Sequence, residues 1–310
     1  MPDRLPLLID TDPGVDDAWA LLMAFASERH QVVGLTITAG NVGLEHTVRN
    51  ALKLCEVAGV DVPVFPGCSV PLVFPAEDAA YVHGRDGFGD TGYLPPSRAA
   101  ESEHAALAMI RLSRAHPGLL LVCLGPLTNL ALALRLDPTL PSRVGRLVVM
   151  GGAVTVQGNT SVSAEFNIAF DPEAAHVVLE AFETYDLIDW EAVLRHGLPH
   201  AEVEAWLDEG TAKAAFYRAI SQRTREWSEG RRGTHWHSAD GLAMAAALEP
   251  EAATGWARHA LRVETGGRLT RGATIVDWAD RSGAPAKARI LVGLDPARFR
   301  HALRRALGLP

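Results

Sequence analysis

The chain has 310 residues, of which 48% are hydrophobic and 21% charged, and its formal net charge is −8. This composition is typical of a globular protein with a substantial core, and the acidic balance argues against a nucleic-acid-binding face. No run of eighteen apolar residues occurs, and the N-terminal apolar run is too short for a secretory signal, so we expect no membrane association. Three widely spaced cysteines, Cys55, Cys68 and Cys123, predict reduced thiols in a cytoplasmic protein.

Strand-like and helix-like segments alternate along the first half of the chain. Strands are expected at residues 5–10, 32–38, 62–65, 119–124 and 146–152, with later candidates at 184–190, 273–278 and 288–294. Helices are expected at 15–27, 43–58 and 127–136, and residues 200–248 are expected to be helical around a basic and aromatic loop, "SEGRRGTHWHS", at 228–238. This rhythm predicts an α/β fold with a doubly wound, mainly parallel sheet flanked by helices. We find no linker or repeat and expect one domain over residues 1–310.

Two long segments rich in turn-forming residues interrupt the rhythm, at 66–98 and 152–170. Long loops inside an α/β domain are more often functional than idle. Ligands of open parallel sheets bind at the carboxyl ends of the strands. We expect four groups of residues at that edge: the acids after the first strand, Asn41 after the second, Leu124 after the fourth and Met150 at the fifth.

The stretch "LLIDTDPGVDDAWALLMAF" places Asp10, Asp12, Asp16 and Asp17 between an apolar run and an apolar helix. A turn and a helix N-terminus account for about two such acids. They do not account for Asp10 and Asp12 at the end of a buried strand, because buried carboxylates need a partner or a cation. Residues 5–28 contain no Lys or Arg. Oxygen ligands without sulfur or imidazole favour a hard cation, Ca²⁺ or Mg²⁺.

Two reaction classes use such an acidic loop. One is a haloacid-dehalogenase-like phosphatase, in which the first acid of an Asp-x-Asp pair is the nucleophile; Gly14 stands here where that class prefers Thr or Val. The other is a metal-assisted hydrolase, in which a carboxylate takes a proton from water.

The stretch "DTDPGVDDAWAL" closely resembles the N-terminal signature of the inosine–uridine-preferring nucleoside hydrolases. Later blocks resemble the same family in the same order: "TITAGN", "VHGRDGFGD", "LGPLTNLA", "VVMGGA", "AEFNIAFDPEAA" and "LTRGATIVD". The resemblance covers roughly residues 5–178 and 234–295. It implies the Rossmann-like nucleoside hydrolase fold, with a Ca²⁺ site at the carboxyl edge of the strands.

The resemblance implies that Asp12 and Asp17 bind the metal ion through their side chains, that Leu124 adds its backbone carbonyl, and that Asp240 is the last ligand. Without the resemblance, Asp240 reads as an ordinary acid in the first turn of a helix. The group implied to bind the substrate consists of Asp16, Asn41, His83, Met150, Asn159, Glu165, Phe166, Asn167 and Trp236. Glu165 and Asn167 flank Phe166, so in an extended segment they would face the same way.

The reaction implied is hydrolysis of the N-glycosidic bond of a ribonucleoside to ribose and free base. Ca²⁺ would hold the ribose 2′- and 3′-hydroxyls and the attacking water, and Asp12 would be the general base because Ca²⁺ acidifies water less than Zn²⁺ does. The transition state is expected to resemble an oxocarbenium ion, stabilised by nearby carboxylate and amide oxygens.

The chain differs from the family at a residue that helps the nucleobase to leave. A His directly precedes the last metal ligand in the family's best-known branch, and here that residue is Ala239. His237 and His83 are the candidate catalytic histidines, and Trp236 could stack on the base. The stretch "LIDWEAVLRHG" also departs, which leaves the preferred base open.

Three hypotheses therefore stand: a Ca²⁺-dependent nucleoside hydrolase, a metal-dependent phosphohydrolase, and a nucleoside- or ribose-binding protein of the same fold that has lost catalysis. The resemblance further suggests a small-molecule nucleoside substrate, a homodimer or homotetramer, and a role in purine and pyrimidine salvage.

Overall fold

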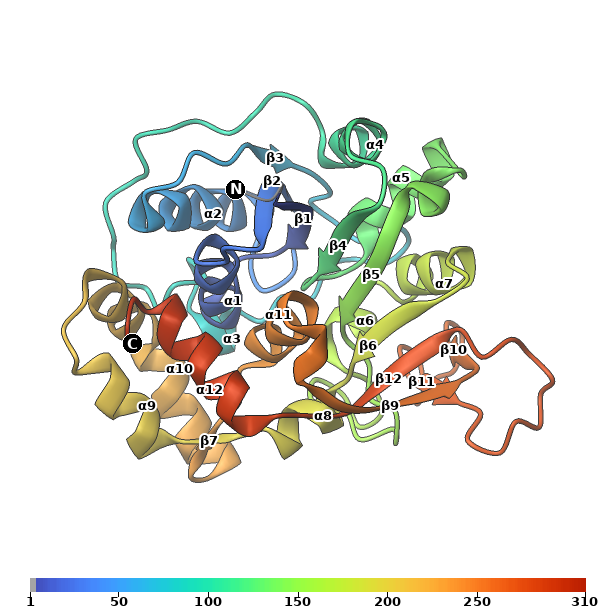
Figure 1. Ribbon diagram of the computed structural model, residues 1–310. Helices are drawn as coiled ribbons and strands as arrows, with labels where there is room; N and C mark the ends of the chain where they lie inside the picture. Colours follow the sequence, from blue (N-terminus) through green and yellow to red (C-terminus); the bar gives the residue numbers. More distant parts are fainter. Residues whose placement is uncertain (1–3) are drawn as a thin grey trace.

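The computed structural model describes residues 4–310 and has an eight-stranded central sheet (Figure 1). The sheet order is β3-β2-β1-β4-β5-β6-β12-β9, and its pairs are parallel except the last, between β12 and β9. The strands are β1 Leu5–Thr11, β2 His30–Ile37, β3 Val64–Pro66, β4 Leu119–Cys123, β5 Val144–Met150, β6 Tyr185–Ile188, β12 Ala288–Leu294 and β9 Ala253–His259. The predicted mainly parallel sheet flanked by helices is confirmed.

Helices cover both faces of this sheet. The α-helices are α1 Val15–Phe25, α2 Leu44–Ala58, α3 Ala80–His83, α4 Ala105–Ala115, α5 Thr128–Leu136, α6 Phe166–Phe170, α7 Pro172–Ala181, α8 Trp190–Arg195, α9 His200–Leu207, α10 Ala212–Arg232, α11 Ala239–Leu248 and α12 Pro296–Ala306. Short 3-10 turns lie at Leu140–Arg143 and Pro250–Ala252. Two small two-stranded ladders add β7 Leu198–Pro199 with β8 His235–Trp236, and β10 Leu261–Val263 with β11 Thr274–Val276.

Successive side chains of the central strands enter two separate cores, as the two-residue period of a strand requires. Leu7 and Ile9 of β1 pack with α1, α11 and α12, whereas Leu8 packs on the opposite face with α4 and α5. Strands buried on both faces read as continuous apolar runs, which is why the sequence revealed them.

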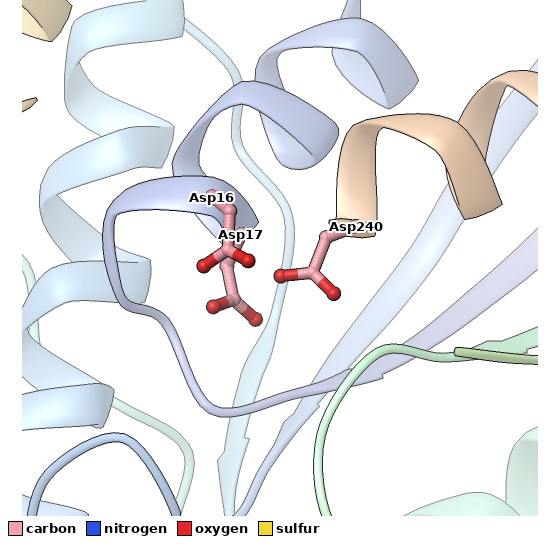
Figure 2. A group of neighbouring side chains, drawn as sticks. All are labelled: Asp16, Asp17 and Asp240. Carbon is pink, nitrogen blue, oxygen red and sulfur yellow. The ribbon is translucent and has the colours of Figure 1, made fainter. Parts of the chain in front are cut away.

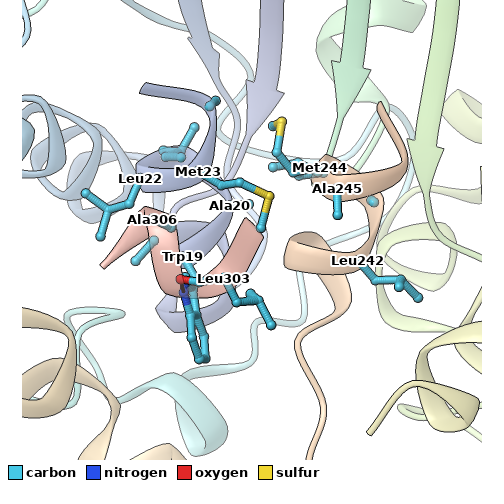
Figure 3. Close-up of a cluster of buried hydrophobic side chains, with 14 of the residues drawn as sticks. Trp19, Ala20, Leu22, Met23, Leu242, Met244, Ala245, Leu303 and Ala306 are labelled. Carbon is cyan, nitrogen blue, oxygen red and sulfur yellow. Dashed lines mark hydrogen bonds between the residues drawn. The ribbon is translucent and has the colours of Figure 1, made fainter. Parts of the chain in front are cut away.

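The first of these cores joins the helix after the acidic loop to two helices from the end of the chain (Figure 3). Trp19 of α1 is fully buried and donates a hydrogen bond from Nε1 to the carbonyl of Leu303 in α12, at 2.9 Å. Met244 of α11 packs in the same cluster. This packing fixes the N-terminus of α1 against the N-terminus of α11.

Two segments differ from their predicted structure. The loop expected at 228–238 is helical as far as Arg232, because α10 buries one face through Tyr217, Thr224 and Ser228 and ends only before Gly233, whose φ is +78°. The segment "AEFNI", considered as extended, instead leads into the short helix α6, because the carboxylate of Glu165 caps the helix by accepting from the N–H groups of Asn167 and Ile168.

The end of the sheet was only partly predicted. Strand β9 was missed, because its segment "ATGWARH" lacks an apolar run and its residues are half-exposed or exposed at the sheet edge. The strand expected at 273–278 exists as β11, but it pairs with its sequence neighbour β10 outside the central sheet. Cys55, Cys68 and Cys123 form no disulfide in the part of the chain that the structure describes. None of the helices in the described chain has the length and apolar character needed to cross a bilayer.

Candidate active site

The carboxyl ends of β1, β2, β4 and β5 meet at one edge of the sheet, and the predicted functional residues gather there. A cavity opens at this edge. Its lining is Asp16, Asn41, Ala79, Tyr81, Val82, His83, Leu124, Met150, Asn159, Thr160, Glu165, Phe166, Asn167, Trp190, Thr224, Trp227, Ser228, Arg232, Trp236, His237, Ala239 and Asp240. Every predicted site residue except Asp12 and Asp17 is in this lining, and those two are buried directly beside it.

Asp12 follows β1 and is held on several sides. Its Oδ2 accepts a hydrogen bond from the backbone N–H of Asn41 at 2.7 Å. A Cβ placed on Gly40 would lie 2.1 Å from Oδ2, and one on Gly125 would lie 2.3 Å from Oδ1. Both positions therefore need glycine for the backbone to approach the carboxylate. Burial, and then the charge of Asp17, raises the pKa of Asp12 well above its usual range.

Three further carboxylates converge on one another (Figure 2), and the charges of two of them, Asp17 and Asp16, act on Asp12. Oxygens of Asp16 and Asp17, from the first turn of α1, and of Asp240, from the first turn of α11, lie within 4.8 Å of one another. Burial raises the pKa of Asp240 well above its usual range, and the neighbouring charges of Asp16, Asp17 and Asp12 raise it further. The four negative groups thus destabilise one another unless protons or a cation compensate them.

The donors of this cluster suit a hard divalent cation. In residues 4–310 no Lys or Arg forms an ion pair with Asp12, Asp16, Asp17 or Asp240, and all the side-chain donors are carboxylate oxygens. Asp17 is already oriented, since it accepts from the Thr11 hydroxyl, from the Gly14 N–H at 2.9 Å and from the Asn41 amide at 3.0 Å. Asp16, which the sequence assigned to the substrate, thus lies in one group with Asp17 and Asp240, whereas Asp12 lies outside that group.

The carbonyl of Leu124, the fourth predicted metal ligand, lies at the end of β4. It accepts a hydrogen bond from Nδ2 of Asn167 at 2.6 Å, and the same amide lies 3.2 Å from the carbonyl of Met150. Asn167 thus bridges the ends of β4 and β5. A carbonyl oxygen has a second lone pair, so Leu124 keeps one acceptor position.

Glu165 and Asn159 occupy the loop between β5 and α6. The Glu165 carboxylate accepts from the N–H of Gly152 at 2.9 Å as well as from α6, and burial raises its pKa to about 7. Oδ1 of Asn159 accepts from the N–H of Phe166 at 2.9 Å. Side-chain oxygens of this loop therefore shape the backbone around the cavity in addition to lining it.

The two candidate catalytic histidines differ in their surroundings. Nδ1 of His83 accepts a hydrogen bond from the Val15 N–H at 3.1 Å, so its Nε2 carries the proton. Burial lowers the pKa of His83 to about 4. Burial and then the charge of Arg232 lower the pKa of His237 to about 4, so both imidazoles are neutral near pH 7.

Aromatic side chains and one guanidinium line the part of the cavity formed by α3, α8, α10 and β8. Trp190, Trp227, Trp236 and Tyr81 belong to this group, and the guanidinium is that of Arg232. Of these, the sequence singled out only Trp236. The sequence marked residues 228–238 as basic and aromatic, but only the continuation of α10 brings Trp227 and Arg232 together at the cavity.

Comparisons with known proteins agree with the family resemblance found in the sequence. Residues 7–301 match the family model described as "Inosine-uridine preferring nucleoside hydrolase". The chain is 38% identical to uridine nucleosidase 1 of Arabidopsis thaliana, over 87% of this chain and 81% of that one. It is 33% identical to the inosine-uridine preferring nucleoside hydrolase of Leishmania major, over 96% of this chain and 95% of that one.

Solved structures agree in fold over nearly the whole chain. An inosine-guanosine nucleoside hydrolase superposes with a TM-score of 0.93 at 30% identity, covering 99% of this chain and 100% of the other. A plant nucleoside hydrolase superposes with a TM-score of 0.92, also at 30% identity and with the same coverage.

Proposed function

The chain belongs to the family of inosine-uridine preferring nucleoside hydrolases, glycosidases that cleave the N-ribosidic bond, and we propose that it uses Ca²⁺ to hydrolyse ribonucleosides to ribose and free base. One observation carries this proposal. Asp16, Asp17 and Asp240 bring three carboxylates together within 4.8 Å at a cavity that indole and phenol rings also line. The first group suits a cation and a hydroxyl-rich sugar, and the second suits a flat heteroaromatic base.

The metal site is assigned to Asp12, Asp17, Asp240 and the Leu124 carbonyl, with Asp16 close by. Carboxylate and carbonyl oxygens are the ligands that Ca²⁺ takes in proteins. Bound there, Ca²⁺ would hold ribose hydroxyls and a water molecule and would lower the pKa of that water.

Asp12 is the proposed general base. Its Oδ2 is held by the Asn41 N–H, so the carboxylate has one orientation in which to take a proton. Positive charge on C1′ in the transition state would be stabilised by the carboxylate of Asp16 and the side-chain oxygens of Asn159 and Glu165.

Ribose binding is assigned to the polar residues of the lining, and base binding to its aromatic part. Asn41, Asn167 and Met150 complete the ribose group, with Phe166 beside it; His83, His237 and Trp236 are assigned to the base. Because both imidazoles are neutral near pH 7, each can donate one hydrogen bond but neither carries a positive charge to the base.

The test is release of reducing sugar from inosine, adenosine, uridine and cytidine, measured with added Ca²⁺ and after exhaustive EDTA treatment. Ribose release that is lost in EDTA and restored by Ca²⁺, but not by Mg²⁺, supports the proposal. Ribose release that survives EDTA contradicts the role of the metal. Nucleoside binding without ribose release would instead support the hypothesis of a nucleoside-binding protein that has lost catalysis. Ala239 motivates that hypothesis, because it stands where the family's best-known branch has a catalytic His.

Four expectations stay predictions. One domain over residues 1–310 rests on the lack of a linker, and a cytoplasmic setting rests on the cysteines. A homodimer or homotetramer and a role in nucleoside salvage rest on the resemblance. Light scattering of the purified chain tests the oligomeric state directly.

A further inference from the structure

Arg232 is the one Lys or Arg among the cavity-lining residues of the described chain. It is the last residue of α10, and its guanidinium carbon lies 4.6 Å from the ring centre of Trp190 and 4.9 Å from that of Trp227. Two indole faces therefore hold the guanidinium by cation–π contact.

The donors of this guanidinium are not used within the protein. Among residues 4–310, no side chain or carbonyl accepts a hydrogen bond from Arg232 and no carboxylate forms an ion pair with it. By contrast, Arg223 and Arg225 on the same helix both have ion-pair partners. Arg232 is half-buried, and the charge of Asp16 acts on it without an ion pair or hydrogen bond forming between them. Its five N–H donors are therefore suited to an acceptor on a ligand.

Among the lining residues of the part of the chain that the structure describes, no other Lys or Arg is present to assist the leaving base. Ala239 has no proton to donate, and His237 is neutral because burial and the charge of Arg232 lower its pKa to about 4. Cleavage of the C1′–N bond leaves the bonding electron pair on the base nitrogen. That negative charge develops in the cavity whose lining holds the Arg232 guanidinium.

We propose that Arg232 is a catalytic residue that stabilises the departing base as an anion, by donating charge-assisted hydrogen bonds to it. This inference rests on the proposed function and assigns the leaving-group role in it. Such bonds are about twice as strong as neutral ones and favour bases with a carbonyl oxygen, onto which the anion delocalises.

The balance of the step is complete. Water adds its oxygen to C1′ and gives one proton to the Asp12 carboxylate, while the C1′–N bond breaks and its electron pair leaves with the base. The base anion takes a proton from solvent after release from Arg232, and Asp12 returns its proton to solvent. The net change is nucleoside plus water to ribose plus neutral base.

The experiment compares two substrates whose leaving groups differ. p-Nitrophenyl β-D-ribofuranoside releases a stable anion that needs little assistance, whereas inosine releases a more basic one. Arg232→Gln should lower kcat on inosine by about 100-fold or more, the usual cost of removing a donor to developing charge, and on the nitrophenyl riboside by less than about fivefold. Arg135→Gln is the matched control, because Arg135 is exposed in the last turn of α5 and is absent from the lining; both rates should be unchanged.

Chemical rescue distinguishes the loss of the guanidinium group from a general disturbance of the fold. Arg232→Ala should regain inosine turnover when millimolar guanidinium is added, with no gain on the nitrophenyl riboside. Equal losses on both substrates without rescue, or full inosine turnover by Arg232→Gln, would overturn the assignment of Arg232. If the wild-type protein releases ribose from neither substrate in Ca²⁺, the proposed function itself fails, so the two failures are distinguishable.

Discussion

Asn41 connects two of the site's carboxylates: its backbone N–H donates to Oδ2 of Asp12 at 2.7 Å, and its side-chain amide donates to Asp17 at 3.0 Å. The same amide lies 3.1 Å from the carbonyl of Asp12. A residue that follows β2 therefore fixes two acids that follow β1. These bonds stabilise the ionised carboxylates against the burial that opposes their charge.

Replacing Asp12 should separate chemistry from folding. Asp12→Asn keeps an acceptor for the Asn41 N–H but cannot take a proton, so kcat should fall by about 10³-fold or more while the melting temperature changes little. Steady-state ribose release and a thermal melt measure the two effects. Asp61→Asn is the control, because the Asp61 side chain is 95% exposed and should leave kcat unchanged. A folded Asp12→Asn protein with wild-type turnover would remove Asp12 as the base.

Metal binding should appear as a stability effect. Because Asp16, Asp17 and Asp240 converge within 4.8 Å, we expect saturating Ca²⁺ to raise the melting temperature by several degrees over EDTA-treated protein. Asp240→Asn should reduce that gain sharply and should also make the metal-free protein more stable, because one buried charge is gone. Differential scanning fluorimetry and calorimetric titration with Ca²⁺ measure both. A full Ca²⁺ gain in Asp240→Asn would place the ion elsewhere.

Gly125 should tolerate no side chain. A Cβ at this position would lie 2.3 Å from Oδ1 of Asp12, so Gly125→Ala must displace the carboxylate, and a shift of about 1 Å costs on the order of 100-fold in rate. Gly43→Ala is the matched control, since a Cβ there meets no atom within 4 Å. Wild-type kcat in a folded Gly125→Ala protein would show that Asp12 needs no such close fit.

Asp189, the N-cap of α8, should make stability depend on pH. Burial, and then the nearby Glu191 carboxylate, raises the pKa of Asp189 from 3.8 to about 8. Glu191 itself accepts from the N–H groups of Val154 and Thr155, which begin the loop leading to Asn159. Because the folded pKa lies above the unfolded one, the contribution of Asp189 to stability is complete below about pH 4 and is lost as the pH rises through 8.

Asp189→Asn removes that loss. Relative to the wild type, the variant should gain little free energy of unfolding at pH 4 and on the order of 5 kcal/mol at pH 8.5, measured by urea denaturation. Asp295→Asn makes the same change at the N-cap of α12, where the hydrogen bonds are exposed, and should show no such growth. An equal effect of Asp189→Asn at both pH values would show that its ionisation is not the cause.

The sequence by itself determined the layered α/β fold and most of the acidic site. Strands buried on both faces are apolar runs, helices beside them carry a 3.6-residue period, and both signals are local. The acids after β1 stood out because they follow a buried strand without a basic partner, and the resemblance to a known family added Asp240, Glu165 and Asn167. Where local signals were weak, prediction failed: β9 has no apolar run, and α10 continues through "SEGRR" because its buried face supports it.

Only the tertiary structure decided which distant residues share the cavity. Asp240 reaches Asp16 and Asp17 because α11 packs against α1 in a core that includes Trp19 and Met244, and no local pattern records that contact. Trp190 follows β6, whereas Trp227 and Arg232 lie on α10, so the cation held between two indoles exists only in the folded chain. Periodicity reports which face of an element is buried, whereas the partners of that face depend on how the whole chain packs.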